Sequence, residues 1–216
     1  TLSQVVALAK EQAGAGAAAL DVNLGAADVD EKTMMRKALA RLAVVTDRPL
    51  VIDSSDPRVI EAALRFYPGR ALINSISGEK AKKAKLFALA RTYGALFILL
   101  PLTSKKLPAK FSDRTAIIER LVKEAIARKF TRDDFFIDAL VMTLSCAPGA
   151  ARTVLQTISW CKKRRFRTVI GLSNISFGFP QRALINRTFL GCAANAGLDA
   201  AIIDPDHKRP LSHSLA

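Results

Sequence analysis

The stretch LVIDSSDPRVIEAAL at residues 50–64 decides the fold of this chain, because it joins a buried strand to a helix through a polar turn. Residues 50–52 are apolar and end on Asp53, as a strand buried on both faces does. The polar residues 54–56 followed by Pro57 are typical of a helix start. Apolar residues then recur at the spacing of one helix face. The stretch is therefore one strand–turn–helix unit.

The same unit recurs along the chain. Seven short apolar runs are present, and six of them close on Asp or Asn: Asp21, Asp53, Asn74, Asp138, Asn174 and Asp204. The seventh run, residues 95–100, ends without such a residue. Helical periodicity fills the intervals and is clearest at residues 117–126, where apolar positions recur at i, i+1, i+4 and i+5. Short apolar strands joined by helical crossovers favour a parallel sheet.

This pattern predicts an α/β protein of the (β/α)₈ TIM-barrel class. We predict strands at residues 18–21, 50–53, 71–74, 95–100, 135–138, 168–172 and 200–203, and helices between them. Because such a barrel needs eight strands, we expect its first strand and last helix to lie outside this sequence. A doubly wound sheet is the alternative, but its glycine-rich phosphate turn is not found. We expect one domain over residues 1–216, with a polar tail at 203–216.

Composition limits the classes of function. The three cysteines, Cys146, Cys161 and Cys192, form no disulfide framework or metal-ligand spacing, and they fit a reducing, cytoplasmic compartment. The two histidines, His207 and His213, lie in the polar tail. No apolar run approaches the roughly 20 residues that a membrane helix needs. We therefore expect neither a metal site nor a membrane span.

The chain is strongly basic, with 33 Lys and Arg against 19 Asp and Glu and a formal net charge of +14. Basic clusters lie at residues 80–85, 105–110 and 162–167. They could form a nucleic-acid patch or a basic surface suited to an anionic ligand or partner. Few aromatic residues interleave with the clusters, and no nucleic-acid-binding motif accompanies them. The second interpretation is favoured, without nucleic acid as a partner.

The polar residues at the strand ends form the candidate site, because parallel strand ends share one face of a barrel. Asp53, Asn74, Asp138 and Asn174 offer two carboxylates and two amides. A carboxylate can accept two parallel bonds from a flat heterocycle that carries several N–H donors. The alternative is that these residues cap the following helices. Serines at 54, 55 and 77 could replace Asp53 and Asn74 as caps.

Several ordered sequence blocks resemble one family. They are LDVNLG at 20–25, IDS at 52–54, INSISGE at 73–79, GLSNISFG at 171–178, Arg182, NRTFL at 186–190 and AGLDAAI at 196–202. The set is similar to the pterin-binding corrinoid methyltransferases, which include methyltetrahydrofolate:corrinoid/iron–sulfur protein methyltransferases and the folate domain of cobalamin-dependent methionine synthases. The resemblance covers roughly residues 18–205, and the block at 171–178 is its most specific part.

The resemblance implies a TIM barrel that moves the N5-methyl group of methyltetrahydrofolate, or a related methyl-pterin, to Co(I) of a corrinoid. A partner protein or domain would carry the corrinoid, and the resemblance also allows a homodimer. By resemblance, Asn174 is the catalytic residue at the pterin N5. The implied substrate-binding residues are Asn23, Asp53, Asn74, Asp138, Gly171, Ser173 and Arg182.

Two other functions stay open. A dihydropteroate-synthase-like enzyme would need cations for a pyrophosphate leaving group near the late strands. Residues 162–167 precede their strand, so they point to the opposite end of a barrel. A non-catalytic pterin-binding subunit is the second alternative, with a partner supplying the activity.

Overall fold

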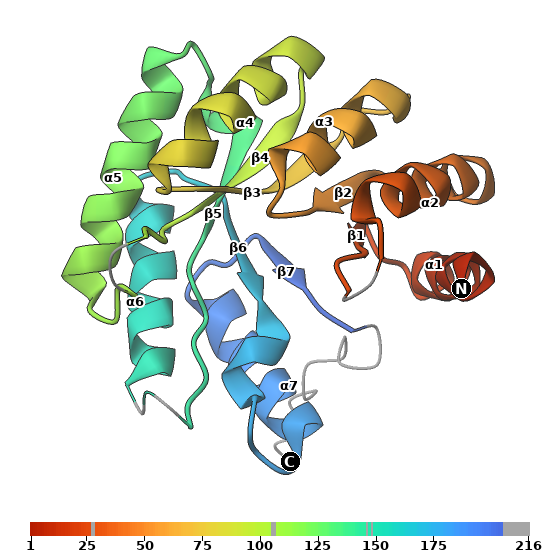
Figure 1. Ribbon diagram of the computed structural model, residues 1–216. Coiled ribbons are helices and arrows are strands. Elements are labelled where there is room, and N and C mark those ends of the chain that lie inside the picture. The colour runs from red at the N-terminus through yellow and green to blue at the C-terminus, as the bar shows by residue number, and fades with distance from the viewer. Residues whose placement is uncertain (27–28, 105–106, 146, 148, 205–216) are drawn as a thin grey trace. The chain divides into compact units, whose positions relative to one another are not determined.

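A computed structural model describes residues 1–204 except 27, 28, 105, 106, 146 and 148 (Figure 1). Cys146, both histidines and residues 205–216 of the predicted tail lie outside the described residues. The chain divides into two compact units, Thr1–Ile98 and Leu99–Ala216. The expectation of one domain over the whole chain stays a prediction.

The first unit alternates helices with parallel strands. Its elements are α1 (Leu2–Gly14), β1 (Leu20–Asn23), α2 (Glu31–Val45), β2 (Leu50–Asp53), α3 (Pro57–Phe66), β3 (Leu72–Ser77), α4 (Lys80–Tyr93) and most of β4 (Leu96–Leu100). Strands β1, β2 and β3 pair in this order, and the register places Asn23 beside Asp53 and Asp53 beside Asn74. The polar residues at the strand ends therefore share one row of the sheet.

The second unit continues the alternation (Figure 1). Its elements are α5 (Phe111–Ala127), the 3₁₀ helix η1 (Arg132–Asp134), β5 (Phe135–Asp138), α6 (Ala150–Lys163), β6 (Thr168–Gly171), the 3₁₀ helix η2 (Leu172–Ser176), α7 (Arg182–Asn195) and β7 (Ala200–Ile202). Strands β5, β6 and β7 are parallel neighbours. Val154 of α6, Ile170 of β6 and Phe189 of α7 belong to one buried cluster.

The helix boundaries follow from local sequence. Asp56 caps α3 by accepting a hydrogen bond from the Arg58 N–H at 2.8 Å, and Pro57 occupies the first helical turn, as predicted. Asp30 caps α2 in the same way. Gly94 ends α4 with φ of 63°, a left-handed conformation that glycine adopts at little cost.

Four predicted strand ends differ from the structure. β1 ends at Asn23 instead of residue 21, and β7 ends at Ile202 instead of residue 203. β3 continues three residues past Asn74, to Ser77, and Ile76 within this extension is buried. β6 ends at Gly171, and Asn174 lies in η2. Leu172 and Ile175 are both buried, and their spacing of three residues is that of a 3₁₀ helix. In both segments a buried apolar residue, Ile76 or Ile175, therefore lies beyond the strand end that the sequence predicts.

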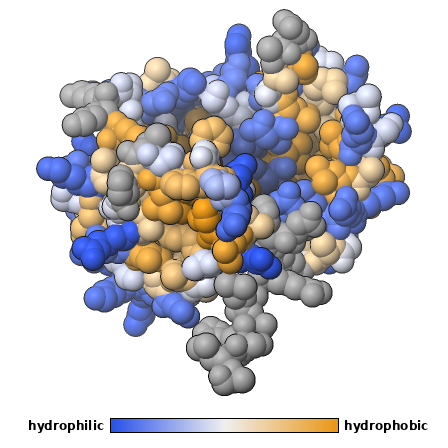
Figure 2. All heavy atoms as spheres, turned by 90° about the horizontal axis from the view of Figure 1, so that it is seen from below, coloured by the Kyte–Doolittle hydropathy of each residue, from blue (hydrophilic) through white to orange (hydrophobic). Residues whose placement is uncertain are grey.

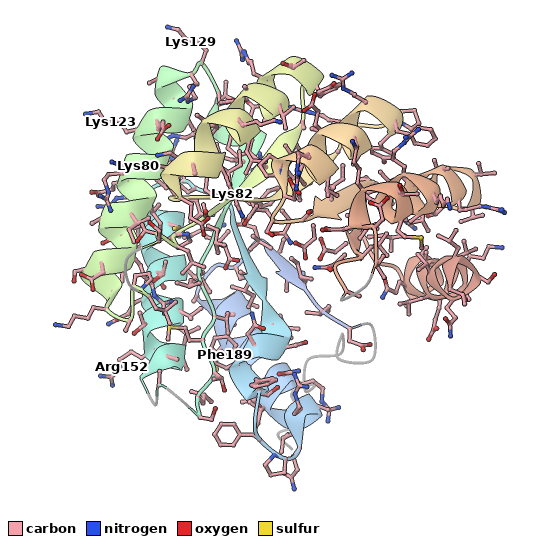
Figure 3. The ribbon with its side chains drawn as sticks, viewed as in Figure 1. Lys80, Lys82, Lys123, Lys129, Arg152 and Phe189 are labelled. Carbon is pink, nitrogen blue, oxygen red and sulfur yellow. The ribbon has the colours of Figure 1, made fainter. Side chains whose placement is uncertain are left out.

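Exposed basic side chains occur on several helices, and the face seen in Figure 2 is mixed in polarity. Figure 2 shows hydrophilic side chains distributed around the face in view, with apolar side chains between them. In Figure 3 the side chains of Lys123 on α5 and Arg152 on α6 point outward, and both residues are exposed. Over the described residues, none of the helices is long and apolar enough to span a membrane.

Candidate functional site

Four polar residues on β1, β2 and β3 form a hydrogen-bonded group, which we call the β1–β3 cluster: Asp21, Asn23, Asp53 and Asn74. The amide of Asn23 donates to Oδ2 of Asp53 at 2.8 Å. The amide of Asn74 donates to Oδ1 of Asp21 at 3.5 Å. The structure therefore brings three predicted site residues together, and each carboxylate keeps acceptor capacity for further donors.

The alternative role as helix caps is wrong for all four predicted residues, Asp53, Asn74, Asp138 and Asn174. The helices that follow the polar strand ends begin at other residues: Asp30, Asp56, Glu79, Gly149 and Gln181. Ser54 accepts a hydrogen bond from the Asp56 N–H, and Ser77 accepts one from the Glu79 N–H. The carboxylate of Asp53 and the amide of Asn74 are thus not used to start helices.

Burial changes the acidity of the two carboxylates in the β1–β3 cluster. Burial, with the charge of Asp53 as a smaller cause, raises the pKa of Asp21 to about 6, although the Asn74 amide acts in the opposite direction. Burial also raises the pKa of Asp53, against the hydrogen bond from Asn23. Partly desolvated carboxylates gain most from a ligand that donates N–H groups, because water no longer satisfies them fully.

Sequence reasoning did not place Asp21 among the site residues. The sequence nevertheless held a sign of its role, since alternate residues of a strand share a face. Asp21 is two residues before Asn23 and therefore lies on the same face of β1. Val22 between them is buried on the other face.

In the second unit, Asp138 ends β5 and accepts a hydrogen bond from the Leu140 N–H at 2.7 Å through Oδ1. Among the described residues, none donates to its Oδ2. Burial raises the pKa of Asp138 to about 6, although the Leu140 N–H and the positive charge of Arg114 act in the opposite direction. Asp138 thus resembles Asp53, a partly desolvated carboxylate with one free oxygen at a strand end.

Asn174 lies on η2, which Arg182 holds in place. The Arg182 guanidinium donates to the Ser173 carbonyl at 3.0 Å and to the Ser176 hydroxyl at 3.1 Å. The described contacts of Arg182 are thus made with this turn, and a direct contact with substrate stays a prediction. The Asn174 side chain is exposed, so its amide is accessible.

Gly171 lies directly beneath the Asn174 amide. A Cβ atom at residue 171 would lie 3.2 Å from Nδ2 of Asn174. The backbone conformation of Gly171 suits any residue, with φ of −83° and ψ of 94°. The absence of a side chain here therefore serves the approach of the Asn174 amide and not the conformation of the turn.

We expect Gly171→Ala to fold normally and to displace the Asn174 amide by a few tenths of an ångström. If Asn174 acts on a reacting atom, such a displacement should slow the reaction by about tenfold and leave ligand affinity nearly unchanged. Single-turnover rates and equilibrium binding measure the two effects separately. Gly191→Ala on α7 is the matched control, because a Cβ there would meet nothing within 4 Å. Equal rates for Gly171→Ala and the native chain would contradict this role.

The described residues bear on two other kinds of site, one for a metal ion and one with the buried thiol of Cys161 as nucleophile. Within the described ranges, no group of three or more His, Cys, Asp or Glu side chains could hold a metal ion. Burial raises the pKa of the Cys161 thiol to about 12, which makes it a poor nucleophile near neutral pH.

The sequence matches the family described as "Pterin binding enzyme" over residues 1–204. The chain is 30% identical to the methylcorrinoid:tetrahydrofolate methyltransferase of Eubacterium limosum over 198 residues, which cover 90% of this chain and 73% of that protein. It is 29% identical to the methionine synthase of Mycobacterium tuberculosis over 219 residues, which cover 95% of this chain. The chain spans only 18% of the length of that methionine synthase.

Solved structures share the fold. The dihydropteroate synthase of Yersinia pestis with a sulfonamide drug has a TM-score of 0.78 at 17% identity, covering 96% of this chain and 82% of that one. The dihydropteroate synthase of Xanthomonas albilineans with 7,8-dihydropteroate has a TM-score of 0.76 at 17% identity, covering 93% and 78%. At such identities the likeness shows the fold alone. It confirms the predicted α/β fold of the TIM-barrel class.

Proposed function

This chain belongs to the pterin-binding enzyme family, and from that premise we propose that it transfers the N5-methyl group of methyltetrahydrofolate to Co(I) of a corrinoid carried by another protein or domain. The observation that carries the proposal is the exposed Asn174 amide on η2, the turn that hydrogen bonds from Arg182 hold in place. The resemblance assigns this residue to the pterin N5. The name of the Eubacterium limosum relative supports methyl transfer between a corrinoid and tetrahydrofolate, although it gives the opposite direction, from methylcorrinoid to tetrahydrofolate.

The resemblance assigns two carboxylates to the N–H groups of the pterin ring, Asp53 in the first unit and Asp138 in the second, and the Asn74 amide to its remaining polar atoms. An amino-pyrimidinone edge presents two parallel N–H donors, which a carboxylate accepts in the way it accepts a guanidinium. Both Asp53 and Asp138 end parallel strands and are partly desolvated, which supports this assignment.

The reaction breaks the N5–CH₃ bond and forms a Co–CH₃ bond. Co(I) supplies the electron pair for the new bond and becomes Co(III), and the N5 electron pair is retained by the pterin, which takes up a proton. A neutral N5 is a poor leaving group without that proton or a strong hydrogen bond. The Asn174 amide can donate or accept, so it can follow N5 through both states. An interaction that strengthens in the transition state lowers the barrier.

The test is a titration with methyltetrahydrofolate followed by mixing with Co(I) corrinoid, with absorbance recording the conversion of Co(I) to methyl–Co(III). We expect saturable binding and methyl transfer that requires the protein. Condensation of a pterin pyrophosphate with p-aminobenzoate would instead support the dihydropteroate-synthase alternative. Binding without either reaction would support a pterin-binding subunit that depends on a partner.

The pH dependence of binding follows from the raised pKa values. If Asp138 accepts pterin N–H groups, it must be ionised in the complex. Its pKa of about 6 in the free protein means that the ionised fraction falls about tenfold for each pH unit well below 6. We expect the dissociation constant for methyltetrahydrofolate to rise accordingly between pH 6 and pH 4.5. Calorimetry across this range measures it, and an affinity that is constant with pH would contradict the role of the carboxylate.

A further inference from the structure

The buried guanidinium of Arg114 lies against the segment that carries Asp138. Arg114 belongs to the first turns of α5 and is fully buried, with no exposed surface. Its Nη1 donates to the carbonyls of Ala139 and Leu140 at 2.8 and 2.7 Å, and its Nε donates to the Pro108 carbonyl at 2.9 Å. One side chain therefore ties α5 and the loop before it to the two residues that follow Asp138.

That segment has an unusual backbone. Leu140 has φ of 57°, in the left-handed region that a bulky residue rarely adopts. The Leu140 N–H is the group that bonds Oδ1 of Asp138, so the left-handed turn and the orientation of the carboxylate depend on each other. An unfavourable conformation of this kind persists only where the surroundings fix it. The two hydrogen bonds from Arg114 to this turn provide such a constraint.

Stability alone is a poor explanation for Arg114. Burying a guanidinium costs desolvation free energy. That cost is usually offset only where the group has a close ion pair and all of its donors are hydrogen-bonded. Among the described residues, Arg114 makes no ion pair within 4 Å, and its Nη2 is buried without a hydrogen-bond partner. Its charge nevertheless acts on Asp138 by electrostatic attraction, which favours the ionised carboxylate.

We infer that Arg114 is a positioning residue, which holds the turn at residues 138–140 so that the free oxygen of Asp138 is directed at the pterin. The inference rests on the proposed function, because that function assigns Asp138 to the ligand. It adds a residue on α5 that contacts neither the pterin nor the reacting atoms.

The test compares methyltetrahydrofolate affinities of Arg114→Lys and Arg114→Met with that of the native chain. Lysine keeps the charge but lacks the planar guanidinium that bonds three carbonyls at once. Methionine fills a similar volume without a charge. We expect both variants to bind at least about tenfold more weakly at an unchanged stoichiometry. Arg120→Lys is the matched control, since Arg120 is exposed on the same helix, and it should bind as the native chain does.

A second substitution separates positioning from general damage. Glycine adopts the left-handed turn readily, so Leu140→Gly in the Arg114→Lys background should restore affinity by about fivefold. Leu140→Ala removes most of the same side chain but keeps the conformational penalty, and it should restore none. If Arg114→Lys does not fold, the same two substitutions are compared in the Arg114→Met background.

The outcomes distinguish this inference from the proposed function. Native affinity in both Arg114 variants, or equal effects of glycine and alanine at position 140, would overturn the positioning role while leaving the proposed function intact. A folded native chain that does not bind methyltetrahydrofolate would instead overturn the proposed function.

Discussion

Asp138→Asn is expected to weaken binding of methyltetrahydrofolate by about 10²-fold and, at the same time, to stabilise the fold near neutral pH. The asparagine retains an oxygen that can accept from the Leu140 N–H, so the turn is kept. It thereby places an amide N–H₂ where the free carboxylate oxygen was, and this group would oppose the N–H donors of a pterin. Losing a charged partner of this kind costs affinity by about 10²-fold or more.

The gain in stability follows from the sign of the pKa shift. A carboxyl whose pKa is raised to about 6 binds its proton more tightly in the folded state than in the unfolded state. The ionised form therefore destabilises the fold fully above about pH 6 and not at all below about pH 4. Replacement by a neutral residue should raise the free energy of unfolding by about 1–2 kcal/mol at pH 7.5, with no gain at pH 4. Urea denaturation at both pH values measures this difference.

Asp133→Asn is the matched control for Asp138→Asn. Its side chain is 94% exposed, just before β5, and the same chemical change there should alter neither binding nor stability appreciably. Native affinity in Asp138→Asn would contradict the assignment of this carboxylate to the pterin. A loss of stability at pH 7.5 would contradict the direction of the pKa shift.

Asn174→Ala is expected to slow methyl transfer by about 10²–10³-fold, the usual effect of removing one donor that acts on developing charge. The dissociation constant for methyltetrahydrofolate should change by less than about threefold, because the interaction with N5 strengthens only as the methyl group leaves. Single-turnover mixing with Co(I) corrinoid at saturating methyltetrahydrofolate measures the transfer step. It is separated from binding, which calorimetry measures.

Asn195→Ala serves as the control for Asn174→Ala, because Asn195 is an exposed asparagine at the end of α7. It should transfer the methyl group at the native rate. Equal transfer rates in Asn174→Ala and the native chain would remove the proposed mechanism, even if the pterin still binds.

The local units of the fold could be predicted from the sequence because their signals are local. The apolar residues 50–52, the cap at Asp56 and the proline at position 57 act within one stretch, and the structure confirms each of them. The end of β6 could not be placed in this way. In the sequence Leu172 continues the apolar run of the strand, whereas in the structure it begins a 3₁₀ helix and is buried in the same core cluster as Ile175.

In the candidate site, too, the residues with a local sequence signal could be predicted and those without one could not. Asp53, Asn74, Asp138 and Asn174 could be named because polar residues that close apolar runs are visible in the sequence. Arg114 could not, because its partners are carbonyls 25 and 26 residues later in the chain and carry no side-chain signature. Its one local sign is a charged residue on the buried face of α5, three residues before Ile117.

The residues that begin the helices differ from those assigned to the ligand, and this has a consequence for redesign. Because Asp56 and Pro57 begin α3 by themselves, the side chain at position 53 can be exchanged for others without undoing that helix. The amide at position 74 is likewise independent of how α4 begins. A library that varies positions 53 and 74 together should therefore yield mostly folded chains, which makes the recognition of other heterocycles accessible on the same framework.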